Sequence, residues 1–574
     1  MPFLGILDDT KLPHVPGTVI LEEDAAHSQD VTGGLKHGTG RNAHIVLVPQ
    51  PSNDPNDPLN WPYTKKLTAL GITCWGSILY AAVVSAMLNS AFYEMSIEIH
   101  TTIPKLVLSS GYQTLVIGVT GPLFSALSRK WGTRPIFLFA SVFCLIADIV
   151  GSCVNTYEGV LASRILQGFA IAPYESLVFT LISDMFYVHE RGIYASCINF
   201  ILAGISNLTG VVAGPIASNI GWRWLYYLLV LFGGIQTILQ FFFVPETSYV
   251  RDRRYEIDEI KNDNLQDLAA LEYQEKLNME KPGVVATHTE ETTGAMPSTP
   301  HSEEESAVAA AAAAHGYQHK KKTFAQELAI FSGTYSNENF FQLLIAPFAV
   351  VLNLAVLWIL LINSMFVVLY VVIAFVLAQL FAPPPYLLSP ASIGYLSLGP
   401  FVGGILGSVI MGTLSDPFIK WCARRNRGVY EPEYRLIPCA LGVCSGVGLM
   451  LFGHFVSEGK SVYACATVHG LMLFGVMFLC IGTSNYALDA YRGMANEIFI
   501  ASMAVKNLIL YGFSYFVNNW TADVGPQHAF YVWGGVAFAL IATLPFMFFL
   551  GKKYRSYWAR NNLLEKMHIR THEE

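Results

Sequence analysis

Arg164-Ile-Leu-Gln-Gly-Phe-Ala-Ile-Ala-Pro-Tyr-Glu175 places two charges and an amide inside an apolar run that is long enough to cross a bilayer. A charge in hydrocarbon costs about 3 kcal/mol on insertion scales, so ionisable residues in a span usually face a partner or a water-filled path. Arg164 and Glu175 are eleven residues apart, which at about 100° per residue returns them to one helix face, together with Gln167. This polar stripe predicts a helix that lines a transport path. The alternative is that Arg164 lies near the helix end and only reaches the headgroups.

The composition excludes a soluble globule. Of the 574 residues, 53% are hydrophobic and 13% charged, and the mean hydropathy is +0.42, so we expect an all-α membrane protein embedded in lipid. The net charge of −7 gives no support for nucleic-acid binding. The nine cysteines are scattered, mostly in apolar runs, without metal-site or disulfide spacing, and we expect no bound metal.

Apolar segments of about twenty residues predict twelve transmembrane helices in two six-helix bundles. The first six lie near 67–90, 106–127, 135–154, 158–182, 193–214 and 223–244, and the second six near 344–376, 391–414, 437–457, 461–486, 495–518 and 529–551. Residues 343–381 are apolar for longer than one crossing needs. The seventh span is therefore either one tilted helix or a helix with a short extension on the outer surface.

Polar segments divide the chain into an N-terminal tail (1–64), a first bundle (65–249), a linker (250–342), a second bundle (343–551) and a C-terminal tail (552–574). The middle of the linker is low in complexity, and we expect it to be disordered. Cations gather in alternate loops, for example at Arg129, Lys130 and Arg134. By the positive-inside rule both termini are cytoplasmic, and we expect the protein in the plasma membrane.

Several local motifs resemble those of the major facilitator superfamily. Arg164-x-x-Gln167-Gly168 resembles motif B of its fourth span, whose arginine is associated with proton coupling, and Gly210-x-x-x-Gly214-Pro215 resembles the antiporter motif C. Gly412-Thr-Leu-Ser-Asp416, after the eighth span, resembles motif A, the loop that braces the cytoplasmic gate. The resemblance implies the major facilitator fold and transport by alternating access.

Further motifs resemble fungal members of the twelve-span drug:proton antiporter group. They are Asp54-Pro-Asn-Asp-Pro-Leu-Asn-Trp61, His189-Glu-Arg-Gly192, Pro245-Glu-Thr-Ser-Tyr249, Glu431-Pro-Glu-Tyr-Arg-Leu436 and Asn485-Tyr-x-x-Asp-x-Tyr491. This resemblance implies export of toxic compounds or secondary metabolites, while some relatives import polyamines or other small cations.

The first-half copy of motif A departs from the family pattern. When Gly132 and Arg134 are aligned to its end, Arg129 takes the place of the acidic residue. A gate that relies on an aspartate at that position is therefore in question here. We assign gating roles to the motif residues Gly210, Gly214, Pro215, Gly412, Asp416, Arg129 and Arg134.

Asp148 lies at a depth in the third span similar to that of Arg164 in the fourth. Because these spans are antiparallel neighbours, we predict an Asp148–Arg164 pair that explains how both charges are tolerated. Glu175 is our candidate proton carrier, because a carboxylate in a span can change its protonation with its surroundings. Two other roles are open for Glu175, namely direct pairing with a cationic substrate and a structural contact to the 189–192 loop.

Lys506 and Asn507 lie about twelve residues into the eleventh span, close to the midplane at about 1.5 Å per residue. A cation there needs an acceptor, which is Glu175 across the cavity, an anionic or polar substrate group, or a structural partner. Glu497 and Asp489 lie at the inner ends of the eleventh and tenth spans, and we expect gating or structural roles for them.

The substrate cavity is expected to be apolar and aromatic with a few polar groups. We assign substrate binding to Tyr174, Glu175, Lys506, Asn507, Trp358 and Tyr486. Further lining candidates are Tyr80, Asn89, Gln113, Asn207, Asn353, Asn363 and Tyr395. Asn519-Trp-Thr521 is a glycosylation sequon so close to the membrane that we expect it to be unused.

These observations predict a proton-coupled secondary transporter that exports small organic compounds as a monomer, with the proton gradient as its energy source and without a cofactor. The alternatives are an importer of a nutrient or polyamine cation and a membrane sensor that does not transport. An enzyme is disfavoured, because the sequence contains no Walker motif, metal-ligand cluster or nucleophile elbow to supply catalytic residues.

Overall fold

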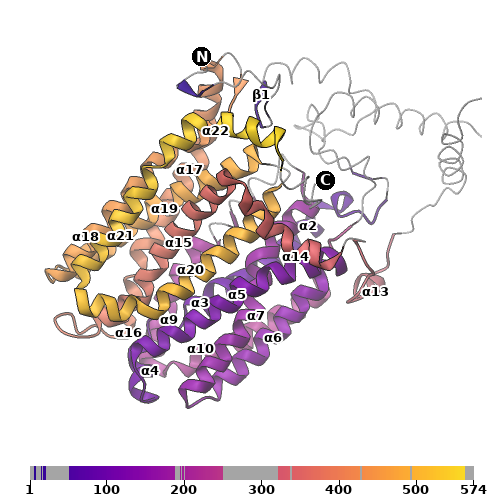
Figure 1. Ribbon diagram of the computed structural model, residues 1–574. Coiled ribbons are helices and arrows are strands. Elements are labelled where there is room, and N and C mark those ends of the chain that lie inside the picture. The colour runs from indigo at the N-terminus through magenta and orange to yellow at the C-terminus, as the bar shows by residue number, and fades with distance from the viewer. Residues whose placement is uncertain are drawn as a thin grey trace, which may run out of the picture.

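The structure of the protein is a computed structural model (Figure 1). It describes residues 5–7, 15, 17–20, 51–52, 54–187, 194, 197–198, 201–249, 321–336, 339–426, 429–491 and 494–562. Two of the predicted features, the disordered middle of the linker and the 189–192 loop, lie outside the described residues.

The first half of the chain forms a bundle of long helices, coloured indigo to magenta in Figure 1. Its elements are η3 (Pro58–Asn60), α2 (Tyr63–Gly76), the π-helix η4 (Ser77–Val83), α3 (Val84–Ala86), α4 (Phe92–Glu98), α5 (Ile103–Trp131), α6 (Thr133–Ser152), α7 (Tyr157–Met185), the π-helix η5 (Ile201–Ile205), α9 (Ser206–Ile220) and α10 (Arg223–Phe243). Local signals fix the helix ends. Thr156 caps α7 by accepting the Gly159 amide at 3.4 Å, and Gly221, with φ of 101°, terminates α9.

The second half forms the other bundle, coloured red to yellow in Figure 1. Its elements are α14 (Phe340–Ala349), η7 (Val350–Leu352), α15 (Leu354–Phe381), α16 (Pro390–Tyr395), α17 (Leu398–Arg425), η8 (Pro432–Leu436), η9 (Pro438–Gly442), α18 (Val443–Ser457), α19 (Val462–Ala490), α20 (Ala495–Val524), α21 (Pro526–Ile541) and α22 (Leu544–Arg560). The short helix α13 (Phe324–Glu327) precedes it, in the described part of the predicted linker.

Among the described residues, eleven helices are long and apolar enough to cross a membrane. The remaining predicted span corresponds to η5 and α9, which follow each other without a break from Ile201 to Ile220. That helix ends six residues later than the predicted 193–214, so Pro215 lies inside it. The architecture is the predicted all-α membrane fold of two six-helix bundles.

Two short strands mark one end of the molecule. β1 (Val19–Ile20) pairs antiparallel with β2 (Val429–Tyr430), the strand that follows α17. We call this end, in the upper part of Figure 1, the strand end. Segments from both halves of the chain thus meet there.

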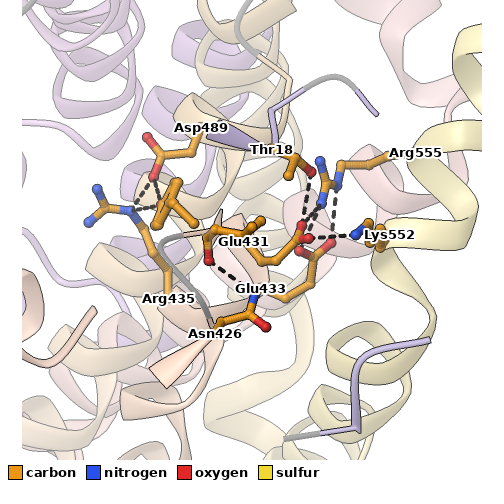
Figure 2. A network of polar contacts seen from close by, with 10 residues as sticks. Thr18, Asn426, Glu431, Glu433, Arg435, Asp489, Lys552 and Arg555 are labelled. Atoms are coloured by element: carbon orange, nitrogen blue, oxygen red, sulfur yellow. Dashed lines mark hydrogen bonds and ion pairs between the residues drawn. The ribbon is translucent and has the colours of Figure 1, made fainter. Parts of the chain in front are cut away.

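A polar network surrounds β2 at the strand end, as Figure 2 shows. Arg555 of α22 donates from Nη2 to Glu433 Oε2 at 2.8 Å and to Glu431 Oε2 at 3.2 Å. Lys552 pairs with Glu431 at 2.6 Å, and the Thr18 hydroxyl donates to Glu431 at 2.9 Å. These contacts extend α22 to Arg560, beyond the predicted span end at 551, and tie residues next to β1 to the second bundle.

The seventh span differs from the prediction. Asn353 is the N-cap of α15 and its side chain accepts the Ala355 amide at 3.0 Å, so a new helix begins there. The span is therefore Leu354–Phe381 rather than 344–376. The extra apolar residues form α14, which precedes the span at the strand end and packs against both α5 and α20.

The eighth span also differs at its end, because α17 continues to Arg425 instead of stopping near 414. The Gly412–Asp416 motif therefore lies within a helix rather than in a loop. The motif itself contains no proline or positive-φ residue that would end the helix.

Described parts of the linker pack on the first bundle. Glu327 of α13 pairs with Lys65 of α2 at 2.7 Å, and the Tyr335 amide donates to the Lys130 carbonyl at 2.9 Å. The segment 321–336 therefore contacts the bundle that precedes the linker before the chain enters α14.

Candidate transport site

Helix α20 carries one set of contacts between the two bundles. It lies along α5 and the end of α7, and close packing requires small residues there. A Cβ added at Gly118 would meet the Ala504 carbonyl oxygen at 3.1 Å. From Glu497 to Tyr515, α20 rises about 27 Å at about 1.5 Å per residue, so its contacts sample three depths of the membrane.

The middle contact joins two charges. Lys506 of α20 forms an ion pair with Glu175 of α7, and Asn507 Nδ2 donates to the other carboxylate oxygen at 3.4 Å. The side chains of Lys506 and Glu175 keep 22% and 14% of their exposure, so neither is fully buried. Of the acceptors predicted for Lys506, the structure places Glu175 next to it.

The contact at the strand end contains an ion pair and a ring stack. Arg129 in the last turn of α5 pairs with Glu497 in the first turn of α20 at 3.3 Å. Two residues further along α20, Phe499 stacks on Phe179 of α7 with ring centroids 5.4 Å apart and planes inclined by 6°. The two bundles are therefore in contact on this side of the midplane.

The bundles also touch at the end opposite the strand end. The hydroxyls of Tyr112 on α5 and Tyr515 on α20 lie 3.1 Å apart. Gly214 of α9 lies against α16, where an added Cβ would meet the Pro390 carbonyl oxygen at 2.6 Å, and Gly210 lies against Ser397. The glycines of the motif at 210–214 thus serve an approach between bundles.

A buried polar cluster lies inside the first bundle. Gln167 Nε2 donates to Asp148 Oδ1 at 2.7 Å, and its Oε1 accepts from Gln113 at 3.2 Å and from Arg164 at 3.4 Å. Arg164 also donates to the Val84 carbonyl at 2.7 Å. Arg164, Asp148 and Gln167 are each fully buried, so Arg164 does not reach the headgroups.

The predicted Asp148–Arg164 pair is wrong in its details. Among the described contacts the two side chains form no direct ion pair, because the Gln167 amide stands between them and bonds to both. The equal depth of the two residues brings them near each other, but the Gln167 amide, which donates at one end and accepts at the other, lies between them. Arg164 Nε and Nη2 are buried without a hydrogen-bond partner in the described part of the chain, so the amide satisfies the guanidinium only in part.

Three residues assigned to substrate binding belong elsewhere. Tyr174 is buried within the first bundle, where its hydroxyl bonds to Ser141 at 2.6 Å. Trp358 donates to Thr543 at 2.7 Å within the second bundle. Tyr486 is buried at the strand end beside Tyr491. Each packs within its own bundle, so these three assignments are corrected.

The lining candidates have mixed outcomes. Tyr80 is buried and donates to the Gly233 carbonyl at 3.1 Å, and Asn353 is a helix cap. Asn363 donates to Ser484 at 3.1 Å and is partly exposed, whereas Gln113 belongs to the Arg164 cluster. Of the other candidates, Asn207 is buried, Asn89 is partly buried and Tyr395 is exposed.

Two residues assigned to gating motifs have other environments. Arg134 is buried and donates to the carbonyls of Phe241 at 2.7 Å and Leu328 at 3.2 Å, so it ties the first bundle to the linker segment. An added Cβ at Gly412 meets nothing within 4 Å, so close packing does not explain that glycine. Asp416 lies in α17, and its side chain is outside the described part of the chain.

The sequon residue Asn519 is exposed in the last turns of α20. The Thr521 hydroxyl, which the sequon also needs, is buried and donates to the Val517 carbonyl at 2.6 Å. The sequon thus lies inside a helix, and that it is unused stays a prediction.

Several contacts between the bundles were not predicted from the sequence. Phe179 follows Glu175 by four residues and Phe499 precedes Lys506 by seven, so each lies on the helix face of its charged neighbour. That spacing was a usable signal. Tyr112 and Tyr515 had no such marker in the sequence.

The arrangement provides a carboxylate that is shared between two bodies. It offers a site for a proton or a cation at Glu175, an ammonium at Lys506 and an amide at Asn507. Its position between contacts near both ends of α20 is where alternating access requires a binding site.

A family model described as Major Facilitator Superfamily matches residues 74–499. The uncharacterized MFS-type transporter C1271.10c of Schizosaccharomyces pombe is 25% identical over 96% of this chain and 94% of its own length. The efflux pump FUB11 of Gibberella fujikuroi is 24% identical over 78% of this chain and 68% of its own length.

Among solved structures, the xylose transporter XylE from E. coli, in a partially occluded inward open conformation, is similar with a TM-score of 0.51. The match has 12% sequence identity and covers 84% of this chain and 98% of XylE. The likeness is one of fold.

Proposed function

Because the chain belongs to the Major Facilitator Superfamily and is a membrane transporter of that family, we propose that it is proton-coupled and exports small organic compounds by alternating access. The observation that carries this proposal is the ion pair between Glu175 of the first bundle and Lys506 of the second. A charge pair between two moving bodies links the protonation of one residue to their relative position.

Protonation of Glu175 removes the negative charge that holds Lys506. A cationic or hydrogen-bonding group of a substrate competes for the same carboxylate, and Asn507 supplies a further polar contact. Proton and substrate therefore exclude each other from Glu175. Mutual exclusion at one site is what couples the entry of a proton to the exit of a substrate.

We propose further that the proton gradient is the energy source, that no cofactor takes part, and that the strand end is cytoplasmic in the plasma membrane. The cations of the predicted inner loops support this orientation, because Arg129, Lys130 and Arg425 all lie in last turns of helices that end there. Similarity to a protein named an efflux pump supports export over import.

The test is flux into sealed vesicles that contain the purified protein, with an imposed pH gradient and a panel of hydrophobic drugs and polyamines. We expect uphill movement of a compound against the proton flow in the wild type and its loss in Glu175→Gln. The matched control is Glu158→Gln, because Glu158 is an exposed carboxylate in the first turn of the same helix. It should transport as the wild type does.

Other outcomes decide between the alternatives. Movement of a polyamine in the same direction as the proton would identify the importer. Folded protein that moves no compound under either gradient would favour the sensor. Uphill export that survives in Glu175→Gln would reject Glu175 as the proton carrier.

A further inference from the structure

We propose that Arg129 and Glu497 form a latch of inverted charge that closes the cytoplasmic end of this transporter. The inference rests on the proposed alternating access and on the strand end being cytoplasmic. It names a gating contact that the motif comparison left open, because Arg129 stands where motif A has an acidic residue.

The contact joins the two bundles at their very ends. Arg129 Nη1 lies 3.3 Å from Glu497 Oε1, and the two side chains keep 14% and 2% of their exposure. Removal from water strengthens the attraction between two charges relative to a pair on the open surface. Because both charges have lost water, removal of one partner costs more here than at an exposed pair, so closure depends on both side chains.

Each charge lies at the helix end that favours its sign. Arg129 is in the last turn of α5, where the helix dipole stabilises a cation, and Glu497 is in the first turn of α20, where it stabilises an anion. An aspartate at position 129 would have the unfavourable sign for the end of α5. With arginine in place of the acidic residue of motif A, the two side chains attract each other, and each also interacts favourably with the dipole of its own helix.

Two neighbouring elements make the latch part of a closed end. Phe499, two residues after Glu497, stacks on Phe179, and α14 packs against both α5 and α20. Opening toward the cytoplasm must separate α5 from the start of α20. It must therefore break the Arg129–Glu497 pair and uncover the ring stack.

The test measures amide hydrogen exchange of the full-length protein in lipid nanodiscs, for the peptides at the end of α5 and the start of α20. We expect Arg129→Gln and Glu497→Gln each to raise exchange there at least fivefold, which corresponds to about 1 kcal/mol. Arg129→Glu, which opposes two carboxylates, should raise it further. Exchange at the opposite end, around Tyr112 and Tyr515, should fall or stay unchanged.

The double variant Arg129→Glu/Glu497→Arg restores an attractive pair with both charges at the wrong helix ends. We expect its exchange to lie between that of the wild type and that of Arg129→Glu. The matched control is Glu327→Gln, which breaks the 2.7 Å pair with Lys65 at the same end without joining the two bundles. It should leave exchange in α20 unchanged.

The latch is refuted if the double variant exchanges as fast as Arg129→Glu, or if the single variants leave the end of α5 and the start of α20 protected. Equal increases at both ends of the molecule would also refute it, since they indicate general destabilisation. The measurement needs no substrate and no pH gradient. Its failure is therefore distinct from a failure of proton-coupled transport.

Discussion

Replacement of Asp148 by asparagine tests how the buried arginine is stabilised. Asp148 accepts from Gln167 at 2.7 Å and is fully buried, and Gln167 in turn accepts from Arg164. The asparagine keeps an acceptor for Gln167 but removes the one carboxylate of the cluster. A hydrogen bond to a charged group contributes about 1.5–3 kcal/mol, and we expect a loss near 2 kcal/mol because part of the bond survives.

The assay is unfolding of the purified protein in detergent for wild type, Asp148→Asn, Gln167→Leu and the double variant. If Gln167 transmits the charge of Asp148, the two substitutions couple by about 1–2 kcal/mol in the cycle. Asp523→Asn, at an exposed position near the end of α20, should stay within about 0.5 kcal/mol of the wild type.

Additive effects of the two substitutions would refute the bridge. An Asp148→Asn variant as stable as the wild type would refute the stabilising role of the carboxylate altogether. We also expect loss of transport in Asp148→Asn to follow loss of folded protein, because the cluster lies within the first bundle rather than at the contact with α20.

Three further predictions concern other contacts. Gly214→Leu should reduce transport at least tenfold with normal amounts of folded protein, because the side chain would overlap Pro390 across the bundles. The control Gly234→Leu should transport normally, since no atom of the described residues lies within 4 Å of a Cβ added at Gly234. Equal flux in both variants would contradict the close approach. Glu433→Gln should lower the free energy of unfolding by about 2–3 kcal/mol, because it disrupts the contact in which both Glu433 carboxylate oxygens accept from the buried Arg555, while the Glu431 contact remains. A change under about 0.5 kcal/mol would be inconsistent with the network in Figure 2. The hydrogen bond from Arg223 lowers the pKa of Glu98 below its ordinary 4.5, so this contact stabilises the protein above that pH and is lost as the pH falls through the lowered pKa. Unfolding measured at neutral and acid pH should therefore show a smaller acid-induced loss of stability in Glu98→Gln than in the wild type. An equal loss in both proteins would show that the Glu98–Arg223 contact does not contribute to this loss.

The strongest parts of the prediction came from charges in apolar surroundings. Arg164, Glu175 and Lys506 stand out because an ionisable residue in a span needs a partner. Glu175 was one of three acceptors considered for Lys506, and the structure places the two side chains together. Depth counted along two helices was the argument for pairing Asp148 with Arg164. It was not enough, because depth does not reveal that the side chain of Gln167 reaches both.

The helix boundary at Asn353 had no hydropathy signal. Apolar residues continue on both sides of it, and an asparagine there was interpreted as a cavity amide, although its side chain caps α15. Tyr174, Trp358 and Tyr486 failed for a related reason. An aromatic residue in an almost wholly apolar helix carries no sign of which face meets the cavity and which meets the bundle core.

The network around β2 was out of reach of local sequence reasoning. Arg555 and Glu433 are 122 residues apart along the chain, and Thr18 is 413 residues from Glu431. The motif at 431–436 was recognised only as a family resemblance. Its charges are explained once α22 and β1 are seen to meet there.

The central claim is that Glu175 binds and releases the coupled proton. Infrared difference spectra of the purified protein in lipid, recorded between neutral and acid pH, report carboxyl groups directly. Many Asp and Glu side chains contribute to the carboxylic acid band that grows on acidification. We predict one component of this band that is present in the wild type and in Glu158→Gln and absent in Glu175→Gln. If the band is unchanged in Glu175→Gln, with no component lost, another group carries the proton, and the Glu175–Lys506 pair is a structural contact.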